Sequence, residues 1–292
     1  MITPPVILTD KLQHKMERIA FKLCELLNVK GPINFQFAIK DEEIYCIEAN
    51  PRGSRTLPFL SKAYQKSFPT LATYALLGEK MPSPQIHRPN YFSVKQSTFP
   101  FDRFLSDNLL LGPKMRSTGE TMGIDYDKDK AILKSYRGNY PKLDLSLNQN
   151  KILLSLADGN KEQILTYLKP LTKLGMQFLA TEGTYHYIQK QGIKATLVEK
   201  VDSQQTLKHQ SIPMLEVLKD DQLLMVLNTP LNKNQSQTEG ELIRNLAILY
   251  GVPCFTRIEN IKAVLDALIG CSGTDVSPIA LQELSKNQEN LL

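Results

Sequence analysis

The chain has 292 residues and a mass of 33.0 kDa, more than a single hydrophobic core usually supports, so two domains of ordinary size are expected. Apolar residues make up 42% and charged residues 22%, values typical of soluble globular proteins, which excludes a wholly disordered chain and a membrane bundle. The net charge of +5 arises in residues 1–150, where 21 Lys and Arg stand against 15 Asp and Glu; residues 151–292 carry 14 against 15. Without Trp or a basic stripe, this surplus favours a phosphorylated small molecule over a nucleic acid as ligand.

Cysteine spacing and hydropathy bear on the cellular compartment. The four cysteines, Cys24, Cys46, Cys254 and Cys271, stand at least 17 residues apart, which fits neither a zinc site nor a redox Cys-x-x-Cys pair. The apolar runs are about five residues long, far below the ~20 needed to cross a bilayer. The N-terminus also lacks the charged-then-apolar pattern of an export signal. We therefore expect free thiols in a cytoplasmic protein that does not enter a membrane.

The first half begins with one amphipathic helix followed by a hairpin. Apolar residues recur at helical spacing over residues 12–27, with Thr9 or Asp10 as N-cap. Two short β-type runs, residues 33–39 and 44–49, are separated by charged residues and predict a hairpin. Further on, residues 91–100 are expected to be extended, and residues 109–123 have the Gly-rich, polar character of a binding loop.

The hairpin offers the first candidate site. With a three-residue turn over residues 41–43, the numbers of opposed residues sum to 84, and apolar and polar side chains separate onto two faces. In that register Gln36 stands opposite Glu48, and Asn34 stands opposite Asn50. Such a cluster of oxygen ligands is what Mg²⁺ prefers. Arg52 and Arg55 follow directly, and their planar guanidinium groups suit phosphate oxygens. A polar face that only meets water explains the same pattern.

The second half changes to strands that alternate with helical segments. Short apolar runs occupy residues 152–156, 177–181, 195–199, 223–229 and 254–257. This alternation predicts an α/β fold with a doubly wound parallel sheet. The polar run over residues 143–150 is the expected boundary, so the predicted domains are residues 1–150 and 151–292. A further expectation is that Pro170 kinks or splits the helix around it.

Several stretches together carry a family resemblance. They read NFQFA (residues 34–38), IEANPRGSR (47–55), YFSVK (91–95), LLGPKMRSTGE (110–120) and LLSLADGNK (153–161). In this order and spacing they resemble the carbamoyl-phosphate synthase large chain, whose C-terminal portion contains the metal-binding end of an ATP-grasp domain. The resemblance extends from about Pro4 to about Leu268. It implies an α/β chain in which residues 1–150 are the C-terminal part of the carbamate-phosphorylating ATP-grasp domain, with a connecting segment.

This resemblance assigns roles to the hairpin residues. It implies that Gln36, Glu48 and Asn50 bind Mg²⁺ or Mn²⁺ together with ATP, and that Arg52 and Arg55 are catalytic residues facing the transferred phosphoryl group. Metal ions and arginines of this kind neutralise the charge that develops during phosphoryl transfer. By the same resemblance Glu120 belongs to an activator-binding loop, in which Lys114 replaces the usual acidic residue. A surface glutamate without a ligand is the alternative for Glu120.

A second cluster of polar residues falls at the ends of predicted strands in the second half. Thr181 and Thr184 border a strand end and a helix start, Lys161 opens the preceding helix, and Thr229 ends a later strand. Ligands of doubly wound folds bind at this edge, where helix N-termini favour anions. The segment resembles the methylglyoxal-synthase-like regulatory domain of the same large chain. The implied phosphate-binding residues are Lys161, Thr181, Thr184, Lys200 and Thr229.

The resemblance also implies partners and leaves alternatives open. Expected partners are the upstream part of the large chain, a glutamine amidotransferase small subunit, and a nucleotide effector such as UMP or IMP. No nucleotide-covering loop or adenine pocket precedes the hairpin, and no Gly-x-Gly-x-x-Gly or Walker sequence occurs. A fragment, a split subunit and a relic therefore remain possible. The implied activity is ATP-dependent phosphorylation of carbamate to carbamoyl phosphate for pyrimidine and arginine biosynthesis; the alternative is an inactive nucleotide-binding regulatory module.

Overall fold

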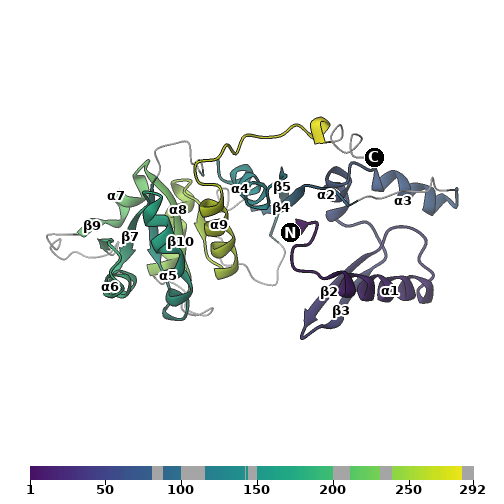
Figure 1. Cartoon of the computed structure of the whole chain (residues 1–292), viewed down its shortest axis with the longest axis horizontal. Helices are drawn as coiled ribbons and strands as arrows, with labels where there is room; N and C mark the ends of the chain where they lie inside the picture. Colours follow the sequence, from purple (N-terminus) through teal and green to yellow (C-terminus); the bar gives the residue numbers. More distant parts are fainter. Residues whose placement is uncertain are drawn as a thin grey trace. The chain divides into compact units, whose positions relative to one another are not determined.

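The computed structural model of the chain describes residues 1–80, 88–99, 116–141, 143, 150–199, 211–230 and 239–284 (Figure 1). Within those residues no helix is long and apolar enough to cross a membrane. The chain divides into two compact units. The first unit comprises Met1–Lys95, Ile124–Tyr126 and Pro278–Leu292, and the second comprises Gln96–Gly123 and Asp127–Ser277.

The first unit is mainly helical, with one isolated hairpin. Helix α1 (Asp10–Leu26) begins as expected at Thr9, whose hydroxyl accepts a hydrogen bond from the backbone N–H of Leu12 at 3.4 Å. The hairpin strands β2 (Asn34–Lys40) and β3 (Glu43–Asn50) follow, then α2 (Thr56–Ala63) and α3 (Phe68–Leu77). A small sheet has the order β1-β4-β5, with strands β1 (Ile2–Thr3), β4 (Phe92–Thr98) and β5 (Gly119–Asp125), of which β1, residues 92–95 of β4 and residues 124–125 of β5 belong to the first unit. The extended stretch predicted over residues 91–100 is thus confirmed as β4 for its described part.

The predicted hairpin turn is wrong by one residue. Lys40 pairs with Glu43 rather than with Ile44, because Asp41 and Glu42 form a two-residue turn with φ values of 51° and 61°. Two consecutive left-handed residues give the turn type whose twist matches paired strands. A register shift after Gln36 then restores the predicted pairing toward the base of the hairpin. The clean separation of faces therefore fails near the turn.

The second unit is built on a parallel sheet of order β11-β10-β6-β7-β8-β9, which confirms the predicted doubly wound α/β fold. In the register Leu153 lies between Leu179 and Val226, and all three side chains are buried. The strands are β6 (Lys151–Ser155), β7 (Gln177–Thr181), β8 (Thr196–Glu199), β9 (Ser211–Pro213), β10 (Leu223–Asn228) and β11 (Cys254–Phe255). Only the short β9 was not predicted.

Helices cover both faces of this sheet, as Figure 1 shows for the labelled elements. One core cluster joins Ile152 and Leu154 to α5 and α9, and the other joins Leu153 and Val226 to α7 and α8. Alternate strand residues therefore face opposite layers. The helices are α4 (Lys128–Asn139), α5 (Asp158–Lys173), α6 (Glu182–Lys190), α7 (Met214–Lys219), α8 (Glu239–Leu249) and α9 (Ile258–Gly270).

The expected effect of Pro170 on its helix is not seen. Helix α5 is not split at Pro170, because this residue lies in the last turn, four positions before the C-cap Leu174, where few helical hydrogen bonds remain to be lost.

The predicted domain boundary between residues 150 and 151 stays a prediction. Residues 144–149 lie outside the described residues. Helix α4, which precedes that boundary, packs in the same core as α9 through Leu133 and Tyr136.

Candidate functional site

The hairpin keeps the predicted oxygen ligands in register. Gln36 is paired with Glu48, and Asn34 is paired with Asn50. The amide nitrogen of Asn50 donates a hydrogen bond to Oε1 of Glu48, so these two side chains lie in contact. Carboxylate and amide oxygens at neighbouring positions fit a hard divalent cation that keeps several waters or phosphate oxygens. Among the described residues no group of three His, Cys, Asp or Glu could hold a metal, but this set contains only one residue of those types.

The hairpin is held at the surface with little packing around it. No residue of α1, β2 or β3 is buried. Two ion pairs connect α1 to the hairpin: Lys11 to Glu42 in the turn at 3.3 Å, and Lys15 to Glu43 at the start of β3 at 3.4 Å. Exposed pairs of this kind contribute little stability. The metal ligands predicted here are therefore accessible rather than enclosed.

The two arginines lie directly after β3. Arg52 is exposed, and its Nη1 donates to the carbonyl of Gly53 at 3.1 Å. Arg55 is also exposed and occupies the N-cap position of α2, where its side chain makes no capping hydrogen bond. Both guanidinium groups thus follow the metal-ligand positions in the chain and remain at the surface, where an anionic phosphoryl group could reach them.

Glu120, Lys114 and Lys200 are the other residues to which the sequence assigns a place in a binding site. Glu120 is exposed on β5. Lys114 and Lys200 lie outside the described residues. The role of Glu120 in binding an activator stays a prediction.

The predicted phosphate-binding threonines come together at the C-terminal edge of the parallel sheet. The hydroxyl of Thr184 accepts a hydrogen bond from the backbone N–H of Leu156 at 3.0 Å, and the hydroxyl of Thr229 accepts one from Ala157 at 2.8 Å. Residues from three strand ends thus meet at the segment that follows β6. Each hydroxyl retains its proton for donation to a ligand oxygen. Thr181 caps α6 from the end of β7, and its side chain makes no capping hydrogen bond.

Lys161 lies in the same cluster. Its Nζ donates to the carbonyl of Gly183 at 2.8 Å and lies 2.6 Å from a carboxylate oxygen of Asp158. The lysine side chain is 8% exposed, whereas that of Asp158 is 86% exposed. A buried ammonium beside the start of α6 is suited to a phosphate group, because the helix N-terminus adds positive potential. Lys161, Thr184 and Thr229 therefore lie close together at the starts of α5 and α6, and their binding of a phosphate stays a prediction.

A buried arginine at the same edge was missed by the sequence analysis. Arg244 on α8 donates through Nη1 to Oδ1 of Asn228, the last residue of β10, at 2.8 Å. Burial lowers the pKa of Arg244, although the nearby Cys254 and Glu241 act in the opposite direction. The signal was present, since Arg244 stands three residues before Ala247 on the apolar face of a helix.

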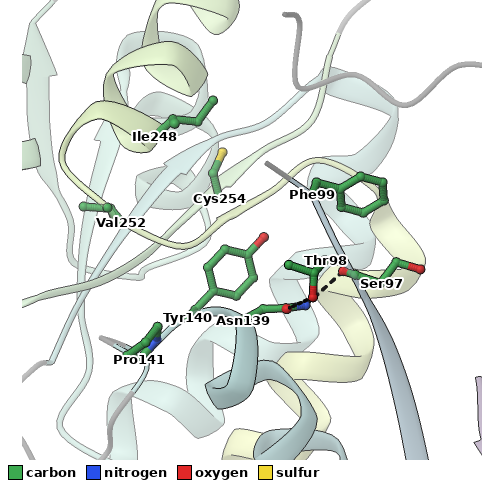
Figure 2. A pocket seen from close by; sticks show the side chains of 10 residues that line it. Ser97, Thr98, Phe99, Asn139, Tyr140, Pro141, Ile248, Val252 and Cys254 are labelled. Carbon is green, nitrogen blue, oxygen red and sulfur yellow. Dashed lines mark hydrogen bonds between the residues drawn. The ribbon is translucent and has the colours of Figure 1, made fainter. Parts of the chain in front are cut away.

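A separate pocket of about 320 Å³ opens near the beginning of β11 (Figure 2). Figure 2 shows Tyr140 lying across it, with Cys254 and Phe99 to either side of its hydroxyl in this view. Burial, with smaller contributions from Cys254 and Tyr136, raises the pKa of Tyr140 to about 12. None of the described lining residues carries a charged side chain at neutral pH, so the pocket does not match a phosphate. The lining is Ser97, Thr98, Phe99, Asn139, Tyr140, Pro141, Ile248, Gly251, Val252 and Cys254.

Comparison with known proteins identifies the family. Residues 1–68 match the family model described as "Carbamoyl-phosphate synthase L chain, ATP binding domain", and residues 163–256 match the "MGS-like domain". The carbamoyl phosphate synthase large chain of Methanosarcina barkeri is 31% identical over 293 residues, which cover 99% of this chain and 71% of the relative. The chain belongs to the carbamoyl phosphate synthase large chain family.

Two other members of the carbamoyl phosphate synthase large chain family are similar over nearly the whole chain. The large chain, C-terminal section, of Methanocaldococcus jannaschii is 32% identical over 99% of this chain, and the large chain of Rubrobacter xylanophilus is 35% identical over 91%. This chain spans only 47% and 25% of their respective lengths. It therefore corresponds to a section of the large chain, and the family resemblance read from the sequence is confirmed.

Proposed function

We propose that this chain supplies part of the site at which a carbamoyl phosphate synthase phosphorylates carbamate with ATP, together with an effector-binding regulatory domain. The observation that carries the proposal is the register of the hairpin, which sets Gln36 opposite Glu48 and Asn34 opposite Asn50 in a chain of this family. The products implied are carbamoyl phosphate and ADP, and the carbamoyl phosphate would serve pyrimidine and arginine biosynthesis in the cytoplasm.

In this proposal the hairpin residues position and neutralise phosphate. Gln36, Glu48 and Asn50 would hold Mg²⁺ or Mn²⁺ through side-chain oxygens, and the ion would supply positive charge at the phosphate oxygens of ATP. Arg52 and Arg55 would donate hydrogen bonds to the phosphoryl oxygens as their charge redistributes during transfer to carbamate. Because no residue of α1, β2 or β3 is buried, we expect the upstream part of the large chain to cover this surface and provide the nucleotide pocket.

The regulatory part of the proposal rests on the strand-end cluster. Lys161, Thr184 and Thr229 converge at the C-terminal edge of the sheet, and Thr181 caps the adjacent helix. We infer that they bind the phosphate of a nucleotide effector such as UMP or IMP, with Lys200 as an additional cation. Pro230, where a small hydroxyl residue is usual, and Cys254, where some relatives have an aromatic residue, leave the choice of nucleotide to experiment.

The test is reconstitution. The chain is mixed with a separately expressed upstream section of a large chain and a glutaminase small subunit, and carbamoyl phosphate is measured with bicarbonate, glutamine, Mg²⁺ and ATP. Formation of carbamoyl phosphate that depends on this chain and on Glu48 supports the proposal. Failure of every such mixture, with upstream sections that work alongside another C-terminal section, would refute the catalytic role.

A second function is a regulatory module that binds a nucleotide monophosphate without taking part in phosphoryl transfer. It is favoured by the contrast between the two units, because the strand-end cluster lies on a well-packed core while the hairpin does not. Calorimetry separates the two functions. Binding of UMP or IMP together with no activity in any reconstituted complex identifies the regulatory module.

A further inference from the structure

Arg244 is a buried cation at the edge of the parallel sheet. Arg244 is 2% exposed to solvent, and Asn228, which it contacts, is 1% exposed. The contact is a hydrogen bond of 2.8 Å from Nη1 of the arginine to Oδ1 of the asparagine. Guanidinium groups carry only donors, so the oxygen of the amide must face the arginine. The hydrogen bond therefore fixes which way the Asn228 amide points.

This arrangement leaves two buried donors unmatched. Nδ2 of Asn228 and Nε of Arg244 have no hydrogen-bond acceptor within the described residues, although both atoms are shielded from solvent. A buried donor without an acceptor costs free energy, and a buried cation costs more unless an anion balances it. Both unmatched atoms are donors, so the missing group is an acceptor, and the charge of Arg244 favours one that is negative.

The charges around Arg244 do not supply that anion. Glu241 and Cys254 are the groups whose charges act on the guanidinium, and neither forms a hydrogen bond to it among the described residues. Burial raises the pKa of the Cys254 thiol to about 12, with Arg244 acting in the opposite direction, so the thiol is neutral at pH 7. Among the described residues the hydrogen-bond partner of the guanidinium is therefore a neutral amide, and the Glu241 carboxylate acts on it through its charge alone.

The position of the pair matches that of the strand-end cluster. Asn228 ends β10, and the next residue, Thr229, binds the N–H of Ala157 in that cluster. Gly240 in the first turn of α8 lies against the pair: a Cβ there would be 3.2 Å from Nη1 of Arg244 and 3.4 Å from Nδ2 of Asn228. The positive end of the α8 dipole therefore adds to the charge of the arginine.

We propose that Arg244 is a positioning residue of the effector site: it orients Asn228 so that Nδ2 donates to an oxygen of an anionic ligand, and its buried charge strengthens the binding of that anion. This inference rests on the proposed binding of a nucleotide phosphate at the strand-end cluster. In this role the arginine acts through the Asn228 amide and through its charge.

The experiment measures the affinity of the full chain for UMP and for inorganic phosphate by calorimetry, in the unmodified protein and in two arginine variants. Arg244→Met keeps the volume and removes both charge and donor, whereas Arg244→Lys keeps the charge and a donor for Asn228. We expect Arg244→Met to weaken UMP binding by about 10- to 100-fold, the loss typical of a charge-assisted interaction. Arg244→Lys should retain affinity within about fivefold.

Thermal unfolding of the same variants separates positioning from packing. A buried charge is often replaced by a hydrophobic residue without loss of stability, so Arg244→Met should unfold at the same temperature as the unmodified protein or higher, and Arg244→Lys should unfold at a lower temperature. A positioning role thus predicts that Arg244→Met is the more stable of the two variants and that Arg244→Lys binds UMP more tightly. A packing role predicts the same order for both. The control Arg18→Met removes one exposed arginine of α1 and should leave both quantities unchanged.

Gly240→Ala supplies a variant that does not touch the charge. The added Cβ would press on both the guanidinium and the Asn228 amide and shift them by a few tenths of an ångström, while alanine favours the helix. We expect weaker UMP binding without loss of stability. If UMP and phosphate bind the unmodified protein but affinity is unchanged in Arg244→Met, the inference is overturned and the effector site stands. If neither ligand binds the unmodified protein, the proposed effector function fails, and the inference fails with it.

Discussion

The substitution Thr229→Val tests the hydrogen bonds that assemble the strand-end cluster. Thr229 is 5% exposed, and its hydroxyl accepts the backbone N–H of Ala157 at 2.8 Å. Valine has nearly the same shape, so it leaves no cavity, but it offers no acceptor. The N–H of Ala157 then loses its partner in a buried position at the N-cap of α5.

The expected cost follows from that lost acceptor. An unsatisfied buried donor costs about 1–3 kcal/mol, because the N–H gives up water on folding and gains nothing in return. For a unit of this size each kcal/mol lowers the unfolding temperature by roughly 2–4 °C. Thr229→Val should therefore lower the melting temperature of the second unit by about 2–12 °C, measured by differential scanning calorimetry without ligand.

The matched control is Thr172→Val on α5. The Thr172 hydroxyl donates to the carbonyl of Leu168 at 2.9 Å, which lies within the same helix. Because the Leu168 carbonyl keeps its helical partner, this change should alter stability by no more than about 0.5 kcal/mol. If Thr229→Val costs no more than Thr172→Val, the Thr229 hydroxyl does not hold the segment after β6, and the cluster is not organised as described.

Two other predictions concern charge. Glu48→Gln should leave the melting temperature unchanged, because the residue is exposed, yet abolish Mg²⁺-dependent formation of carbamoyl phosphate in a reconstituted complex; full activity would rule out Glu48 as a metal ligand. Burial alone would raise the pKa of Asp220, but the hydrogen bond from Lys151 at 2.7 Å, another from the Gln222 backbone and the lysine charge together lower it. The stabilisation is therefore complete above the unfolded-state pKa of about 3.9 and is lost as pH falls through the lower folded value. In Asp220→Asn the free energy of unfolding should therefore fall less steeply as the pH is lowered through this range. An equally steep fall in the variant and in the unmodified protein would contradict the prediction.

The sheet of the second unit could be predicted because its strands are buried on both faces. Parallel strands covered by helices are apolar along their whole length, and the run from Leu223 to Leu227 has this character. The three-residue strand β9 carries no such signal and is defined only by its pairing with β8. The two-residue strand β1 is likewise recognisable only through its pairing with β4.

In the candidate sites, features set by neighbouring residues could be predicted, and contacts between residues far apart in the sequence could not. The pairing of Gln36 with Glu48 follows from strand periodicity, although the turn was wrong, because a bulge compensates for the two-residue turn. Asp41 is compatible with left-handed backbone, but Glu42 is not among the residues that usually supply it, namely Gly, Asn and Asp. The contact between Arg244 and Asn228 joins a helix to a strand end 16 residues away, and only the structure shows it.

The last prediction concerns the apolar surface of α1 and the hairpin in the first unit. The ATP-binding family model matches only residues 1–68, and in this stretch large apolar side chains are exposed on both the helix and the hairpin, including Phe21, Leu26, Tyr45 and Ile47 at 53–72%. Backbone hydrogen bonds without buried apolar cover open readily, so the amides of α1 and of β2–β3 should exchange with solvent much faster than those of β6 and β10. An upstream large-chain section that completes the ATP-binding domain would bury this surface and slow exchange in α1 and the hairpin, while leaving β6 unchanged as an internal control. Hydrogen exchange followed by mass spectrometry measures both regions at once. If protection in α1 and the hairpin already equals that of β6 in the isolated chain, or does not change in a complex that forms carbamoyl phosphate, then this apolar surface is not where the rest of the ATP-binding domain docks.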